Sequence, residues 1–237
     1  MSKNSSFLAN LFHQYDSNSN EQITPVIGLA VSRDTSGLNN AGALIFGGST
    51  IGLAAEINAT IDTTTGFPIS TSSFSGSGHV FNDTSMQYVI TVSCLAAQNA
   101  TFTFNTLLTN GTNSTGPFSE KFYLSTSDTV ISLAPDIAAQ INGMFDPPAI
   151  PTGDYQTYFV SCNATAPNLS LTINNSTFAI NPLDLLRHVS DGLCISTITA
   201  NLHGHHVLGD AFLRNVLVVL DFTTKVMHLG SRPYYES

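Results

Sequence analysis

The stretch that decides the fold is residues 207–215, VLGDAFLRN, with residues 216–230, VLVVLDFTTKVMHLG, directly after it. Two apolar residues and a glycine open the stretch, and residues 209–215 could form one short helix. Residues 215–222 and 226–229 are rich in valine and leucine, a composition typical of buried strands. The tail therefore predicts a strand, a short helix and two further strands.

The rest of the chain is predicted to consist mainly of strands. Residues 24–33 and 43–46 are apolar runs separated by a polar loop that contains Gly37, and this pattern predicts a hairpin. Further strand-like segments are spread along the chain: residues 87–93, 101–104, 121–125, 158–160, 169–173 and 178–180.

Helical signals are few and short. Residues 135–145 begin with Pro135, carry apolar residues on one side and stop before two prolines. Residues 7–12 and 182–189 each fit one short helix. We therefore expect a mainly β fold of antiparallel sheets with a few short helices. The composition changes nowhere sharply enough to indicate a linker between domains.

The composition excludes several classes of protein. Charged residues make up 10% of the chain, against about 25% in an average soluble domain. Seven lysines and arginines against sixteen acidic residues give a formal net charge of −9, so a basic surface for nucleic acid is not expected. No apolar run reaches the roughly 18 residues that a membrane span needs.

Serine, threonine and asparagine replace the missing charge, and they create many Asn-x-Ser/Thr sequons. Sequons begin at Asn4, Asn113, Asn174 and Asn175, and at six asparagines that we take as candidate glycosylation sites: Asn58, Asn82, Asn99, Asn110, Asn163 and Asn168. Composition alone produces part of this number, yet low charge with many sequons suits a secreted glycoprotein.

The amino terminus lacks the features of a signal peptide. The first 15 residues contain no continuous apolar run and no small-residue cleavage site. We expect an extracellular protein whose signal lies upstream of this chain; the alternative is that the protein is not secreted.

Three cysteines are present, Cys94, Cys162 and Cys194. An odd number in an oxidising compartment implies one disulfide and one thiol that is free or bonded elsewhere. Their spacing does not choose among the three possible pairings.

The tail resembles the closing segment of pepsin-like aspartic peptidases, in which two hydrophobic residues and a glycine precede Asp, an aromatic-Leu-Arg turn and an apolar strand that ends in Asp. Residues 33–37 (RDTSG) and 42–48 (GALIFGG) are similar to a hairpin of the same family. The segment upstream of that hairpin, residues 7–12, also has a family counterpart. The resemblance extends over nearly the whole chain.

The resemblance implies the carboxyl-terminal lobe of such an enzyme, with antiparallel sheets in a pseudo-barrel. All 237 residues would form a single lobe, and roughly the first 50 would correspond to the sheet between the two lobes. No segment of the chain matches the amino-terminal lobe, which is expected to be absent. The resemblance also implies a disulfide between Cys162 and Cys194, and it gives Cys94 no partner.

Family chemistry needs two carboxylates that share a proton, one from an Asp-Thr/Ser-Gly motif in each lobe. Like charges about 3 Å apart cannot both ionise, so one carboxyl acts as base and the other as acid. Asp-Thr pairs begin at Asp34, Asp62, Asp83 and Asp128, and Gly follows none of them. The first three fit ordinary turns. Asp128-Thr129 alone lies after a strand and before a helix that starts with proline, as the family motif does.

Two registers of this segment on the family motif are possible. Without gaps, Thr126 takes the position of the catalytic Asp, Ser127 that of the following hydroxyl, Asp128 that of the Gly and Thr129 that of the next hydroxyl. The rival register makes Asp128 the catalytic residue, but it needs a two-residue deletion and puts β-branched Val130 in place of the Gly. We favour the ungapped register because a positive φ is costly for a β-branched residue.

The remaining cluster of interest is His203, His205 and His206. Two of these side chains would share one strand face and could bind a metal. No cysteine or carboxylate lies nearby in the sequence, so we expect an exposed loop with neither metal nor cofactor.

These features favour a homologue or fragment of a secreted aspartic endopeptidase that is non-catalytic as this chain. It would keep half of a peptide-binding cleft, lined by Thr126, Ser127, Asp128 and Thr129. One alternative is an active endopeptidase in which Asp128 pairs with an Asp from a separate amino-terminal lobe or a second copy. Another is a glycosylated extracellular interaction protein. The expected partner is a polypeptide substrate or peptide ligand.

Overall fold

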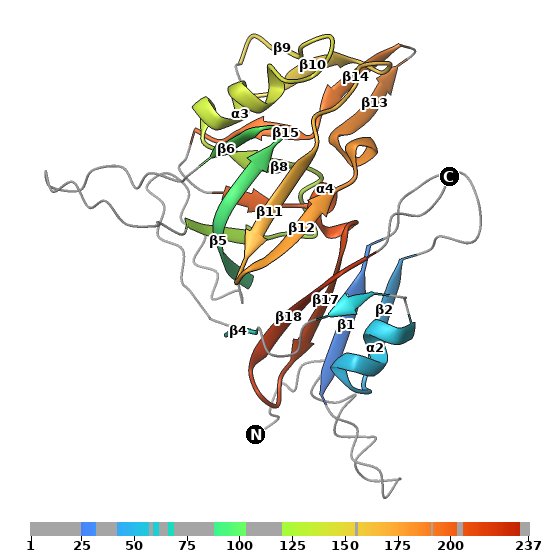
Figure 1. The fold of residues 1–237 in the computed structure, drawn as a ribbon. Coiled ribbons are helices and arrows are strands. Elements are labelled where there is room, and N and C mark those ends of the chain that lie inside the picture. Colours follow the sequence, from blue (N-terminus) through green and yellow to red (C-terminus); the bar gives the residue numbers. More distant parts are fainter. Residues whose placement is uncertain are drawn as a thin grey trace, which may run out of the picture. The chain divides into compact units, whose positions relative to one another are not determined.

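The computed structural model describes residues 25–31, 42–56, 59–61, 66–68, 88–102, 120–154, 156–190, 192–202 and 206–232. Most of these residues lie in β-strands, and the helices are short (Figure 1). The fold class is therefore the mainly β architecture that the sequence predicts. The chain divides into two compact units, which we call the first unit (residues 1–69 and 216–233) and the second unit (residues 70–215 and 234–237). The expectation that the whole chain is one lobe stays a prediction.

The first unit contains one six-stranded sheet in the order β2-β1-β17-β18-β3, with β4 also paired to β18. Its elements are β1 (Val26–Ala30), β2 (Ala43–Phe46), α2 (Thr50–Glu56), β3 (Thr60–Ile61), β4 (Phe67–Pro68), β17 (Val216–Asp221) and β18 (Val226–Ser231). Strands β1 and β2 pair antiparallel, which confirms the predicted hairpin. β1 also pairs antiparallel with β17, so the tail of the chain joins this hairpin in one sheet.

Helix α2 packs on one face of this sheet. Leu53 of α2 is 2% exposed and belongs to an apolar cluster with Val26 and Val219. A Cβ at Gly28 would lie 3.1 Å from Leu53 Cδ1, so the glycine lets the helix approach β1 closely. Alternate residues of β1 and β17 therefore build the core of the first unit.

The turn between β17 and β18 is closed by Asp221. Its Oδ1 accepts hydrogen bonds from the backbone N–H of Thr223 at 2.8 Å and of Thr224 at 3.1 Å. Desolvation, the largest single influence, raises the pKa of Asp221, but hydrogen bonds from Thr224 and Thr223 outweigh it and the pKa is lowered. Lys225 completes the turn with a φ of 56°.

The second unit contains two sheets, a four-stranded one in the order β13-β14-β10-β9 and an eight-stranded one in the order β12-β11-β5-β7-β16-β8-β15 with β6 beside β5. The strands are β5 (Tyr88–Ala97), β6 (Ala100–Phe102), β7 (Glu120–Leu124), β8 (Ile131–Leu133), β9 (Ile150–Pro151), β10 (Tyr158–Ser161), β11 (Leu169–Ile173), β12 (Ser176–Ile180), β13 (Leu186–Ser190), β14 (Leu193–Ser196), β15 (Ile198–Ala200) and β16 (His206–Leu208). The helices are α3 (Pro135–Asn142), the 3-10 helix η1 (Pro182–Leu185) and α4 (Asp210–Leu213).

Helix α3 begins at Pro135 as predicted, but it ends at Asn142. The Asn142 side chain is fully buried and donates hydrogen bonds from Nδ2 to the carbonyls of Ala138 at 2.8 Å and Ile198 at 2.9 Å. The second of these bonds ties the helix to β15. Because Gly143 caps the helix end, the residues up to 145 that were expected in the helix lie beyond it.

The expected helix over residues 182–189 is wrong beyond Leu185. Residues 182–185 form one 3-10 turn, capped by Asn181, whose side chain accepts a hydrogen bond from the Leu183 N–H at 2.9 Å. The chain then becomes strand β13, which pairs antiparallel with β14. Gly192, with a φ of 73°, lies in the connection between the two strands. Tertiary pairing overrides the local helical pattern here.

Several predicted features lie outside the described residues. They are the helix at residues 7–12, the hairpin loop with Asp34, the Asp-Thr pairs at Asp62 and Asp83, five sequons (Asn4, Asn58, Asn82, Asn110 and Asn113), and His203 with His205.

Candidate functional site

The site is built on three neighbouring strands of the eight-stranded sheet. Strand β16 lies between β7 and β8, parallel to β7 and antiparallel to β8. Residues 125–130, which we call the crossing loop, connect β7 to β8 and must therefore pass across the end of β16. The Ser125 N–H donates to the Leu208 carbonyl at 3.1 Å, which holds the start of the loop to that end.

Gly209 packs against the backbone of the crossing loop. Its N–H donates to the Val130 carbonyl at 2.9 Å, and the Asp210 N–H donates to the Asp128 carbonyl at 2.8 Å. A Cβ at position 209 would lie 2.6 Å from the Val130 carbonyl oxygen and closer still to that of Asp128. Only glycine fits between these two carbonyls, which explains the glycine directly before α4 in the sequence.

The crossing loop presents four consecutive polar side chains to solvent. Thr126, Ser127, Asp128 and Thr129 are all exposed, so the loop brings together the four residues that the sequence proposes for the site. The Ser127 hydroxyl lies 3.0 Å from that of Ser125. The loop therefore offers several hydroxyls and a single carboxylate, that of Asp128.

Arg187 of β13 reaches the same loop. Its Nη1 donates to the Thr129 hydroxyl oxygen at 2.9 Å across 58 residues of sequence. Sequence reasoning missed both Arg187 and Ser125. No local pattern marks Arg187, because only the folded sheet brings β13 beside the loop.

The backbone angles of the crossing loop bear on the choice between the two registers of the family motif. The non-glycine residues with positive φ in the described part of the chain are Gln98, Asn174, Asn175 and Lys225, and neither Asp128 nor Val130 is among them. Backbone strain therefore does not separate the two registers. The assignment of Thr126 to the catalytic Asp position stays a prediction.

The chemistry of the loop follows from its side chains. Threonine and serine hydroxyls donate and accept hydrogen bonds, and they stay neutral over the working range of proteins. Acid–base activation of water needs a group whose pKa can be matched to the pH, and in this family two carboxyls that share a proton. The described loop supplies hydroxyls that can form hydrogen bonds and one carboxyl, not a pair.

A polar network in the protein interior holds α4 behind the loop. Asp184, 3% exposed, accepts a hydrogen bond at Oδ2 from Asn215 Nδ2 at 3.0 Å, and its Oδ1 lies 3.9 Å from Arg214 NH1. Asn215 Oδ1 in turn accepts from the Asn181 N–H at 3.0 Å. These contacts join η1 to the end of α4, so the backbone that carries Gly209 has a fixed support.

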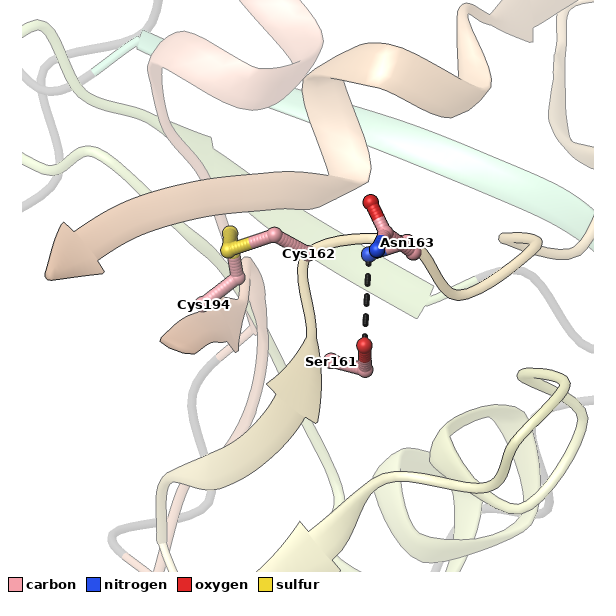
Figure 2. Close-up of a disulfide and its surroundings, with 4 residues drawn as sticks. All are labelled: Ser161, Cys162, Asn163 and Cys194. Atoms are coloured by element: carbon pink, nitrogen blue, oxygen red, sulfur yellow. Dashed lines mark hydrogen bonds between the residues drawn. A yellow bond between two sulfur atoms is a disulfide. The ribbon is translucent and has the colours of Figure 1, made fainter. Parts of the chain in front are cut away.

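The disulfide that the resemblance implied is present. Cys162 and Cys194 are bonded, with their Cα atoms 5.0 Å apart, and the bridge links β14 to the turn that follows β10 (Figure 2). In the same turn, the Asn163 N–H donates to the Ser161 hydroxyl at 3.3 Å. Cys94 is a half-buried free thiol on β5.

Removing this bridge should lower stability substantially. The disulfide closes a sequence separation of 32 residues, and the chain-entropy model assigns such a loop about 3–4 kcal/mol. We expect the double change Cys162→Ser and Cys194→Ser to lower the free energy of unfolding by about 3 kcal/mol, measured by urea denaturation. Cys94→Ser is the matched control and should stay within about 1 kcal/mol of the unmodified chain. Equal loss in both variants would contradict a structural role for this bridge.

The described candidate glycosylation sites are accessible. Asn99, Asn163 and Asn168 are exposed, as are Asn174 and Asn175 in the turn between β11 and β12. Exposure is necessary for attachment of a glycan, and occupancy stays a prediction.

His206 does not lie in an exposed loop, contrary to the sequence expectation. It is 5% exposed on β16, and its ring stacks on Phe122 of β7 with centroids 4.7 Å apart. Parallel pairing of β16 with β7 places the two residues opposite each other. In the part of the chain that the structure describes, no three His, Cys, Asp or Glu side chains gather as a metal site.

None of the described helices is long and apolar enough to span a bilayer.

Comparisons with known proteins match most of the chain to one family. The eukaryotic aspartyl protease family matches residues 39–231. A probable aspartic-type endopeptidase of Aspergillus fumigatus is 37% identical over 119 residues, which are 46% of this chain and 27% of that protein. An acid protease of Saccharomycopsis fibuligera is 27% identical over 113 residues, which are 47% of this chain and 28% of that protein. The matched part thus spans less than a third of these curated relatives. The chain belongs to the eukaryotic aspartyl protease family.

Proposed function

We propose that this chain is a non-catalytic member of its family and that the crossing loop binds peptides without cutting them. The observation that carries the proposal is the row of exposed hydroxyls at Thr126, Ser127 and Thr129, where the family motif requires an Asp-Thr/Ser-Gly sequence. Threonine at the position of the catalytic Asp cannot accept a proton from water, so the lobe would supply neither the acid nor the base.

The local structure around the loop supports the ungapped register. In that register, residues 131–135 take the places of an apolar run that ends in proline. Ile131 and Leu133 are fully buried in β8, and Pro135 is the first residue of α3. These three residues have the packing roles that the ungapped register assigns to them, which supports that register.

The remaining parts of the site suit peptide binding. The exposed hydroxyls can donate to peptide carbonyls and accept from peptide N–H groups. The loop is held from below by Gly209 and the interior network of Asp184, so these hydroxyls have a fixed geometry. A rigid polar loop loses little conformational freedom on binding.

Asp128 favours a second candidate function. Its carboxylate is exposed on the crossing loop, and the two relatives reported above are named as a probable aspartic-type endopeptidase and an acid protease. In this alternative, Asp128 pairs with an Asp from an amino-terminal lobe or from a second copy. The exposed sequons at Asn163 and Asn168 favour a third, an extracellular glycoprotein with no peptide site.

Secretion is part of the proposal. A disulfide is stable in oxidising compartments and rare in the cytosol, and the exposed sequons fit passage through the secretory pathway. Peptides or polypeptides are the proposed ligands.

The proposal is tested with a fluorescein-labelled eight-residue peptide that carries apolar side chains at alternate positions. We expect the chain to bind the peptide and to leave it uncut at pH 3–5. Thr126→Trp places a bulky ring on the crossing loop and should weaken binding at least about tenfold. Thr223→Trp, on the exposed β17–β18 turn, is the control and should leave the dissociation constant unchanged.

Two results would contradict the proposal. Unchanged binding by Thr126→Trp would remove the loop from the binding site. Cleavage that a pepsin-family inhibitor stops and that Asp128→Ala abolishes would establish the second candidate instead.

A further inference from the structure

The outer face of the four-stranded sheet carries one aligned row of side chains. Ile195 of β14 lies opposite Arg187 of β13 on one side and opposite Phe159 of β10 on the other. Phe159 in turn lies opposite Ile150 of β9. Residues directly opposite each other in a sheet share a face, so these four residues form a row across all four strands, which we call the outer row.

The outer row is on the side of the sheet that faces away from the core. The intervening residues Tyr158, Val160 and Cys194, which point to the other face, are 4–5% exposed. In the row, Phe159 is 42% and Ile150 is 67% exposed, whereas Ile195, between Phe159 and Arg187, is 7% exposed. The exposed apolar part of the outer row is therefore Phe159 and Ile150. Neighbouring large apolar side chains at this exposure form a surface suited to a ligand with apolar groups.

Arg187 connects the outer row to the crossing loop. Its Nη1 donates to the Thr129 hydroxyl at 2.9 Å, so the guanidinium lies at the loop, and the Arg187 backbone lies at one end of the row, opposite Ile195. The side chain is exposed, and Arg187 forms no ion pair with the described carboxylates. A guanidinium has five N–H donors in a planar fork that matches a carboxylate.

The negative net charge of the chain makes the position of Arg187 selective for a negative group. The chain has seven lysines and arginines against sixteen aspartates and glutamates, so its overall field repels anions. A fixed cation beside the crossing loop is therefore a local exception, and it complements a negative group on a ligand.

We propose that Arg187 and the outer row form a subsite for a peptide that carries a carboxylate. The guanidinium binds the carboxylate, and apolar side chains of the same peptide cover Phe159 and Ile150. This subsite rests on the peptide-binding function proposed above and names the class of peptide. The carboxylate comes either from the peptide's carboxyl terminus or from an acidic side chain.

Strand spacing sets the separation between the two parts of the subsite. Adjacent strands are about 4.8 Å apart, so Phe159, two strands from Arg187, is about 10 Å from it. An extended peptide advances about 3.3 Å per residue. The apolar side chain over Phe159 should therefore be about three residues from the carboxylate.

Three matched eight-residue peptides with that spacing test the subsite by fluorescence polarisation. The first has a free carboxyl terminus and no acidic side chain. The second has an amidated terminus and one Glu, and the third is the second peptide with Gln in place of Glu. We expect the unmodified chain to bind the first or the second about three- to tenfold more tightly than the third. Whichever of the two gains affinity identifies the source of the carboxylate.

Variants of the full chain identify the residues that cause the preference for a carboxylate peptide. Arg187→Gln should remove the preference, whereas Arg187→Lys should keep part of it. Lys225→Gln, an equal charge change in the first unit, is the control and should keep the full preference. Phe159→Ser should weaken all three peptides by a similar factor, because it removes apolar contact and no charge.

The outcomes separate this proposal from the one it rests on. Binding of the Gln peptide with no preference for either carboxylate peptide would overturn the subsite alone. A preference that survives Arg187→Gln would overturn it as well. Failure of the unmodified chain to bind any of the three peptides would overturn the peptide-binding function and the subsite together.

Discussion

The Gly209→Ala variant is expected to lose the crossing loop and about 4 kcal/mol of the free energy of unfolding. The added methyl group would meet the carbonyl oxygens of Asp128 and Val130, the second at 2.6 Å. Overpacking usually costs 1–3 kcal/mol because neighbouring side chains can move aside. Here the obstacles are backbone atoms, and both carbonyls are fixed by hydrogen bonds to residues 209 and 210 at 2.8–2.9 Å.

Gly153→Ala is the matched control for this change. A Cβ at Gly153 meets no atom within 4 Å, so the same added methyl group should change stability by less than about 0.5 kcal/mol. Urea denaturation followed by circular dichroism measures both variants. Failure of the Gly209→Ala chain to fold agrees with the prediction. A free energy of unfolding equal to that of Gly153→Ala would show that the loop does not pack on Gly209.

The parts of the fold that the sequence predicts are those with a strong local signal. The tail strands β17 and β18 and helix α3 follow from apolar periodicity, turn residues and Pro135. The hairpin of β1 and β2 follows from two apolar runs around a polar loop. Strands β8, β9 and β15 have two or three residues each, too short for a period to be measured.

The parts that the sequence does not predict depend on distant partners. Residues 186–190 form a strand because β14 pairs with them, although their local pattern fits a helix. Burial of His206 depends on Phe122, 84 positions earlier in the chain and opposite it in a parallel pair. A hydrophobic pattern shows that a segment is buried, but not which segment it is buried against.

The candidate site also contains residues that a local motif predicts and one that only the fold brings into place. Thr126, Ser127, Asp128 and Thr129 could be proposed from a motif on one short segment, and the structure places all four on one exposed loop. Arg187 could not, because it reaches Thr129 only through the arrangement of β13. The sequence also did not predict the φ of Val130, which is not positive, because φ depends on how the loop crosses β16 and residue types alone do not fix this.

Rebuilding the family motif is expected to have the largest effect on activity. The changes Thr126→Asp and Asp128→Gly give the crossing loop the Asp-Ser-Gly sequence, with Ser127 unchanged. Both changes alter exposed side chains. The backbone hydrogen bonds from residues 209 and 210 to the loop carbonyls are therefore expected to remain. A carboxyl is then available at position 126 to share a proton with the Asp of a second lobe, which can raise cleavage at least about a hundredfold over the unmodified loop.

A hybrid enzyme shows directly whether the crossing loop lacks a working carboxyl. The chain is fused behind the amino-terminal half of an active pepsin-like enzyme, and cleavage of denatured protein is followed at pH 3–5 with and without a pepsin-family inhibitor. We expect no inhibitor-sensitive cleavage by the hybrid with the unmodified chain, and clear cleavage once Thr126→Asp and Asp128→Gly are introduced together. Inhibitor-sensitive cleavage by the unmodified hybrid that disappears with Asp128→Ala would contradict this expectation, because Asp128 would then be the working carboxyl.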